Sequence, residues 1–154
     1  MGALRRYSIP IGVLCLLLCL ALPGYLFWLA WVFLIFIVDG YNYWKGCASF
    51  MGDLERGAAG QIVVALLAGM ICGFLWEFWN YWSITKWIYT VLLFEGRKLI
   101  EMPTPGYVGF ALFGLETIAF VNLLEGRRFF EKMRWGASGL ALIFALASFI
   151  LIER

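Results

Sequence analysis

Long stretches without a charged side chain constrain this sequence most. Residues 9–38 are uncharged throughout, and residues 58–76, 103–115 and 135–152 are further uncharged, mostly apolar stretches. A transmembrane helix needs about 20 consecutive, mainly apolar residues. Of all residues, 64% are hydrophobic and only 14% are charged, whereas a soluble domain carries about 25% charged residues. The sequence therefore predicts an all-α integral membrane protein.

Turn signals and charged loops divide the chain into about five predicted transmembrane helices within one polytopic domain, residues 1–154. Pro23-Gly24 predicts a tight helical hairpin, and Pro103 and Pro105 suit the first turn of a later helix. A solvated loop with a short turn at residues 49–54 follows the hairpin. The approximate spans are residues 4–22, 25–43, 58–82, 103–124 and 135–152.

Residues 83–102 are aromatic but also charged. The uncharged stretch between Lys86 and Glu95 is too short to cross a bilayer. We therefore expect this segment to lie along the interface, or to enter the membrane and return on the same side, between the third and fourth helices.

Lys and Arg residues favour one orientation. With a cytoplasmic N-terminus, five spans place most of the 12 Lys and Arg residues in cytoplasmic loops, as the positive-inside rule requires. We expect a multi-pass protein of the bacterial cytoplasmic (inner) membrane, with its C-terminus outside. If the Pro23-Gly24 turn were re-entrant, there would be four spans and later loops would change sides. The cytoplasmic set is Arg5, Arg6, Lys45, Arg56, Arg127, Arg128, Lys132 and Arg134; the outer set is Lys86, Arg97, Lys98 and Arg154.

Composition also argues against several cofactors. The chain has no histidine, the usual axial ligand of haem and the commonest ligand of zinc. No metal site and no cofactor are predicted. The four cysteines form no CxxC pair, so we interpret them as reduced, structural residues. The expected surroundings are the lipid bilayer, with no nucleic-acid partner.

Polar residues inside predicted spans are costly in lipid and are therefore functional candidates. Glu77 continues the small-residue stripe Ala65-Gly69-Gly73 by one i+4 step and should face the helix bundle. A buried carboxyl group is either ion-paired or protonated, and Lys86, Arg97 and Lys98 are the candidate partners. The stripe also predicts close packing with a partner helix or a second copy through Gly69 and Gly73.

Two roles stay open for the membrane carboxyl groups: holding helices together, or acting at a site. The candidate acid–base set is Glu77, Asn80 and Glu116. Glu77 and Glu116 are offset by roughly 12 Å along their helices at 1.5 Å per residue, so a shared ligand could join them but a direct hydrogen bond could not. Asp39 is interpreted mainly as an interfacial cap.

Aromatic side chains crowd residues 76–89. An aromatic belt at the outer interface explains such a cluster; a pocket of rings beside Glu77 for a flat lipid or a polyene is the alternative. Because Trp76, Trp79 and Trp82 step by three residues, at most two of them can line one pocket. The candidate ligand-binding residues are Trp76, Trp79, Tyr81, Lys86, Glu101, Tyr107, Asp39 and Asn42.

Several spaced motifs in residues 35–120 resemble a family of bacterial multi-pass membrane proteins without an established activity. The resemblance supports the architecture and the choice of polar positions, and implies no reaction. A fainter analogy, in chemistry alone, is to intramembrane carotenoid and terpene cyclases. The motifs are Asp39-x-x-Asn42, Ser49-x-x-x-Asp53-Leu54, Gly73-x-x-Trp76-Glu77-x-x-Asn80-x-Trp82, Lys86-Trp87-x-Tyr89-Thr90-Val91, Glu101-Met102-Pro103-x-x-Gly106-Tyr107-x-Gly109-Phe110 and Phe113-x-x-Glu116.

Three functional hypotheses follow, and whether the protein is an enzyme stays open. The first is a binding or accessory membrane subunit with buried carboxyl groups and an aromatic outer pocket. The second is a small intramembrane enzyme that uses Glu77 and Glu116 on an isoprenoid-like or other lipophilic substrate. The third is an oligomeric transporter coupled to protons or cations, for which the chain shows no repeated halves.

Overall fold

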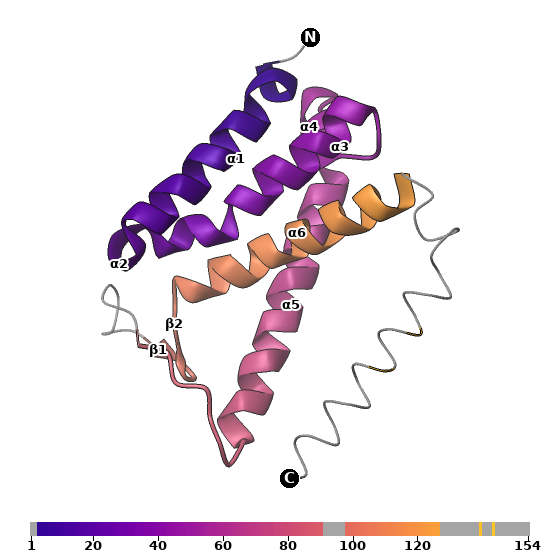
Figure 1. Ribbon diagram of the computed structural model, residues 1–154. Helices are drawn as coiled ribbons and strands as arrows, with labels where there is room; N and C mark the ends of the chain where they lie inside the picture. Colours follow the sequence, from indigo (N-terminus) through magenta and orange to yellow (C-terminus); the bar gives the residue numbers. More distant parts are fainter. Residues whose placement is uncertain (1–2, 91–97, 127–138, 140–142, 144–154) are drawn as a thin grey trace. The chain divides into compact units, whose positions relative to one another are not determined.

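Figure 1 shows the computed structural model of the chain, in which residues 3–90 and 98–126, together with positions 139 and 143, are described. The described part is mainly helical, with one short strand pair. Three of its helices, Leu4–Ala21, Gly60–Trp82 and Gly106–Gly126, are long and apolar enough to cross a membrane. The mainly helical architecture is thereby confirmed, and the three apolar helices are compatible with a membrane protein. The predicted span at residues 135–152 lies outside the described residues except at those two positions.

The first two predicted spans form a helical hairpin, but the second is a broken helix. After α1 (Ala3–Ala21), the chain continues through α2 (Pro23–Leu26), the 3₁₀ helix η1 (Phe27–Trp31), the π-helix η2 (Ile35–Asp39) and α3 (Gly40–Lys45). The two halves are bent by 40°. Branched and aromatic residues, which are weak helix formers, fill this segment. The helix predicted over residues 25–43 is therefore discontinuous, and it lies beside α1 (Figure 1).

The end of the π-helix η2 faces the interior of the protein. Val38 and Asp39, adjacent in sequence, are both buried. Asp39 can therefore reach α4 (Phe50–Glu55), whose N-cap residue Ser49 accepts a hydrogen bond from the Gly52 N–H at 3.1 Å. Helix α4 lies where the sequence predicts a short turn.

Helices α5 (Gly60–Trp82) and α6 (Gly106–Gly126) cross at their small residues. A Cβ atom at Gly69 would strike the backbone at Phe110 and Ala111, and one at Gly114 would strike the backbone at Ala65. The small-residue stripe thus packs against α6 of the same chain. The main buried cluster surrounds this crossing and comprises Val38, Phe50, Ala65, Leu115 and Ala119.

A short hairpin links the long helices. Strand β1 (Lys98–Leu99) pairs antiparallel with β2 (Met102–Pro103), with Lys98 opposite Pro103. Because Met102 and Pro103 belong to this hairpin, α6 begins at Gly106, later than the predicted start at residue 103. Residues 83–90 form an irregular connection without a helix.

Candidate functional site

Glu77 is fully buried and holds two segments that follow α5 in sequence. Its Oε1 accepts a hydrogen bond from the Tyr89 hydroxyl at 2.7 Å, and its Oε2 accepts one from the Met102 N–H at 3.1 Å. The inward orientation predicted from the stripe is confirmed, because Ala65, Gly69, Gly73 and Glu77 are the buried residues of α5. Both carboxylate oxygens act as acceptors, so Glu77 ties the connection and the hairpin to the helix.

Neither of the two lysines named as candidate partners of Glu77 pairs with it in the structure. Lys86 instead pairs with Glu101 at 3.0 Å, and the Lys98 ammonium donates to the Tyr89 carbonyl at 3.4 Å. Arg97 lies outside the described residues. Two neutral donors satisfy the carboxylate of Glu77, so it needs no cation.

Tyr89, whose hydroxyl donates to Glu77, also lines two cavities that are described below. Burial, together with its hydrogen bond to Glu77, raises the pKa of the Tyr89 phenol above its usual value near 10. The neutral phenol is thus favoured in the folded protein, where its hydroxyl is the donor to Glu77.

This raised pKa predicts a loss of stability at alkaline pH. Below about pH 10 the phenol is neutral in both folded and unfolded states, and its contribution is fully present. Above that pH the unfolded chain releases the proton first, so the free energy of unfolding should fall. Detergent-solubilised wild-type protein and Tyr89→Phe should be unfolded at several pH values. A steeper alkaline decline in the wild type is expected; equal slopes would contradict it.

Asn80 closes the turn after α5 instead of joining Glu77. Its amide nitrogen donates to the Trp87 carbonyl at 2.9 Å, and its Oδ1 accepts the Trp87 N–H at 2.6 Å. The Lys86 ammonium lies 4.4 Å from the centre of the Tyr81 ring. The structure thus gives Asn80 and Tyr81 contacts within the connecting segment.

An aromatic pocket lies beside the Glu77–Tyr89 hydrogen bond. Its volume is about 300 Å³. A cavity of about 580 Å³, which we call the adjoining groove, shares Trp31, Tyr89, Met102 and Gly106 with it. The aromatic pocket is lined by Trp31, Trp76, Trp87, Tyr89, Met102, Gly106, Gly109, Phe110 and Phe113. The adjoining groove adds Phe27, Trp28, Val32, Pro103, Pro105, Val108 and Leu112.

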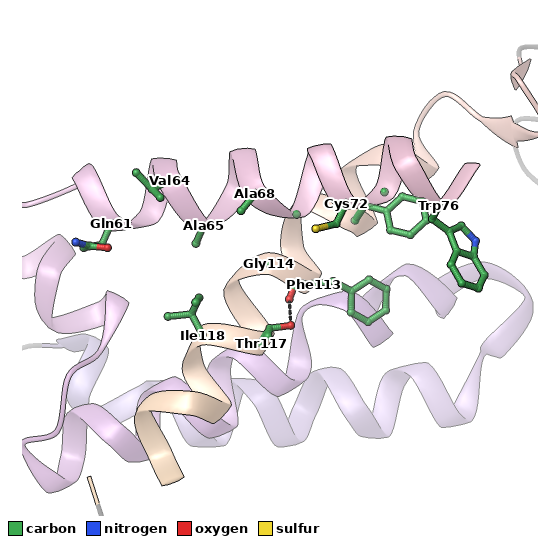
Figure 2. A pocket seen from close by; sticks show the side chains of 13 residues that line it. Gln61, Val64, Ala65, Ala68, Cys72, Trp76, Phe113, Gly114, Thr117 and Ile118 are labelled. Atoms are coloured by element: carbon green, nitrogen blue, oxygen red, sulfur yellow. Dashed lines mark hydrogen bonds between the residues drawn. The ribbon is translucent and has the colours of Figure 1, made fainter. Parts of the chain in front are cut away.

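A third cavity runs along the crossing of α5 and α6, with a volume of about 530 Å³ (Figure 2). Val64, Ala68 and Cys72 line it from α5, and Trp76 at its end also lines the aromatic pocket. The Thr117 hydroxyl lies in this α5–α6 groove but donates to the Phe113 carbonyl at 2.8 Å. The groove is mainly apolar, with Gln61 and Thr117 as its polar lining side chains.

The structure brings the predicted aromatic ligand residues together only in part. Trp76 and Trp79 line one cavity with Asn80, Lys86 and Trp87, and Trp76 also lines the aromatic pocket. Tyr107 is buried, and its hydroxyl donates to the Leu99 carbonyl at 3.0 Å. Of the three tryptophans that step along α5, only Trp76 lines the aromatic pocket.

Asp39 and Asn42 form structural contacts. The two carboxylate oxygens of Asp39 accept the N–H groups of Phe50 and Met51 at 2.9 and 2.8 Å, so its predicted role as a cap is confirmed. The amide nitrogen of Asn42 donates to the Ala119 carbonyl at 2.8 Å and joins α3 to α6.

Glu116 differs from Glu77 because one of its carboxyl oxygens is buried without a partner. It is 5% exposed, and its buried Oε1 has no hydrogen-bond partner among the described residues. No contact joins the carboxyl groups of Glu77 and Glu116 in the described part of the chain. Glu116 lies ten residues, about 15 Å of helical rise, beyond Gly106 at the start of α6. The candidate acid–base set is therefore dispersed.

Sequence reasoning missed several pocket residues. Trp31, Phe110 and Phe113 come from segments far from residues 76–89. The glycine at position 109 was the available signal, because the Trp31 ring lies where its Cβ atom would be. A Cβ atom at Gly106 would instead meet the Met102 side chain.

Comparison with protein-family models, curated proteins and solved structures gives no match to this chain.

Proposed function

We propose that this chain is a membrane protein that binds a lipophilic small molecule in the aromatic pocket, as a binding or accessory protein. One observation carries this proposal. Rings and hydrocarbon side chains from α5, the broken helix, the connection after α5 and the start of α6 converge on two contiguous cavities.

The lining indicates the chemistry of the ligand. Neither the aromatic pocket nor the adjoining groove has a charged residue among its lining side chains. Ligand pockets are typically lined by hydrophobic and aromatic residues with few polar groups. The phenol of Tyr89 is one polar group at the centre, and its hydroxyl is already directed to Glu77. A flat or polyene molecule without charge fits these surfaces best.

Glu77 acts in this proposal as an anchor of the pocket and does not touch the ligand. Its two hydrogen bonds fix Tyr89 and Met102, and both residues line the aromatic pocket and the adjoining groove. Rigid support of this kind keeps a binding site in its productive shape.

A pair of matched substitutions on α6 tests the proposal. Val108 is exposed and lines the adjoining groove, whereas Val121, on the same helix, lines none of the three cavities described above. Val108→Trp should fill the groove, while Val121→Trp adds the same indole elsewhere. Organic extracts of the purified, detergent-solubilised proteins should be compared by mass spectrometry, after size-exclusion chromatography shows that all are folded.

We expect one lipophilic species to be enriched with the wild type and with Val121→Trp, and to fall about tenfold with Val108→Trp. Equal recovery with both variants, or recovery of bulk phospholipid alone, would contradict the proposal.

An intramembrane acid–base enzyme is the second candidate function, and the unpartnered Oε1 of Glu116 favours it. A protonated carboxyl group there would be a general acid in a site shielded from water. In that case Glu116→Gln should fold and retain the extracted molecule without converting it. A transporter would instead require further copies of the chain.

For location, we propose the bacterial inner membrane, with five spans and a cytoplasmic N-terminus. The distribution of Lys and Arg in the loops supports this orientation, and the three apolar helices support the membrane location.

A further inference from the structure

A cavity of different chemistry lies between the first turns of α1 and helix α3. Its volume is about 620 Å³. We call it the basic cleft, and it is separate from the aromatic pocket because the two share no lining residue. The lining residues are Arg5, Arg6, Ile9, Pro10, Tyr41 and Trp44.

The Arg5 side chain is held in place, but not all of its N–H groups have an acceptor. The Arg5 Nη2 donates to the Trp44 carbonyl at 2.9 Å, and the guanidinium lies 5.7 Å from the centre of the Tyr43 ring. The Nε of Arg5 is buried and has no hydrogen-bond partner among the described residues. The Arg5 guanidinium thus keeps hydrogen-bonding capacity that no acceptor among the described residues uses.

No residue of the cleft forms an ion pair in the described part of the chain, although Glu55 accepts a hydrogen bond from Tyr43, whose ring lies beside Arg5. The described residues form two ion pairs, Arg56 with Asp53 and Lys86 with Glu101, and neither includes a residue of the cleft. Lys45 does not line the cleft, but its ammonium lies 4.1 Å from the centre of the Trp44 ring. An anion bound in the cleft would meet the two arginines that line it.

The position of the cleft along α1 selects a lipid as the source of that anion. Arg5 and Arg6 stand at the end of a helix that can cross the membrane and whose remaining residues, 7–21, are uncharged. Basic and aromatic residues at the ends of spans lie at the level of the lipid head groups. Ile9 and Pro10 continue the cleft toward the apolar part of α1, where an acyl chain would run.

We propose that the basic cleft binds one anionic glycerophospholipid, with its phosphate on Arg5 and Arg6 and its first acyl carbons against Ile9 and Pro10. Arginine is suited to this role because its planar fork of donors matches phosphate oxygens. Basic pockets between transmembrane helices recognise anionic lipid head groups by the same chemistry.

Native mass spectrometry of the purified full chain in a non-ionic detergent tests this proposal. The protein is titrated with dioleoyl phosphatidylglycerol and, separately, with dioleoyl phosphatidylcholine, which has the same chains and no net charge. The test variant is Arg6→Gln, because Arg6 is exposed and its substitution leaves the Arg5–Trp44 hydrogen bond intact. Arg56→Gln is the matched control, since it removes an equal charge from an exposed arginine outside the cleft.

We expect one phosphatidylglycerol to bind about tenfold more tightly than phosphatidylcholine, and Arg6→Gln to abolish most of this preference. Arg56→Gln should retain it. Equal binding of the two lipids, or equal losses in the two variants, would overturn the proposal. Inorganic phosphate is the third ligand: if it saturates the cleft as readily as phosphatidylglycerol, the site binds free phosphate and the lipid assignment is wrong.

Discussion

Gly114→Ala is expected to lower the free energy of unfolding by about 3 kcal/mol, the upper part of the range for overpacking. A methyl group at this position would collide with the backbone carbonyl of Ala65 and approach the backbone nitrogen of Gly69 to 3.0 Å. Neither atom belongs to a flexible side chain, so the two helices must move apart. Separation of α5 and α6 would also loosen the core residues Leu115 and Ala119.

The matched control for this substitution is Gly60→Ala in the first turn of α5. A Cβ atom at Gly60 meets no neighbouring atom within 4 Å, and alanine is the better helix former. Thermal unfolding in detergent, followed by far-ultraviolet circular dichroism, should show a lower midpoint for Gly114→Ala and an unchanged or higher one for Gly60→Ala. Similar midpoints for the two variants would mean that α5 and α6 do not pack as described.

This crossing shows what sequence periodicity can predict. Residues 65, 69, 73 and 77 repeat every four positions, which places them on one face of a helix. The structure confirms that this face is buried. The identity of the partner helix could not be read from the pattern, because a stripe of small residues fits α6 of the same chain and a second copy equally well.

The broken helix shows where local sequence reasoning reaches its limit. Residues 25–43 have the length and hydropathy of a span, and these properties do not distinguish an α-helix from consecutive 3₁₀ and π segments. Asp39, at the end of the π-helix, contacts α4, and Trp31 forms part of the wall of the aromatic pocket. Both depend on packing between segments distant in sequence.

The partners of Glu77 were equally hidden from the sequence. Charge patterning suggested lysines, since a buried carboxylate commonly pairs with a cation. The actual donors are a phenol 12 residues away and a backbone N–H 25 residues away. A backbone donor leaves no trace in side-chain identity, so only the fold of the 98–103 hairpin brings Met102 to Glu77.

Glu77→Leu is expected to destabilise the protein by about 3 kcal/mol, because it removes the acceptor of two hydrogen bonds. The Tyr89 hydroxyl and the Met102 N–H would then be partly or wholly buried without partners, and each unsatisfied donor costs about 1–3 kcal/mol. Glu77→Gln should lose less, about 1–2 kcal/mol, since the amide oxygen replaces one acceptor while its NH₂ group faces the other donor. Glu101→Gln is the control: its carboxylate pairs with Lys86 in a partly exposed position, where such pairs contribute about 0–1 kcal/mol.

A double-mutant cycle distinguishes the anchor proposed for Glu77 from a catalytic role. Residues in one hydrogen-bond network show non-additive losses of stability, so Glu77→Leu combined with Tyr89→Phe should cost less than the sum of the single substitutions by about 1 kcal/mol. Unfolding midpoints for the four proteins, converted to free energies, give this coupling. Additive losses would mean that the hydrogen bond does not stabilise the fold. In that case, a Glu77→Gln protein that folds with wild-type stability yet leaves a bound lipophile unconverted would assign Glu77 to catalysis.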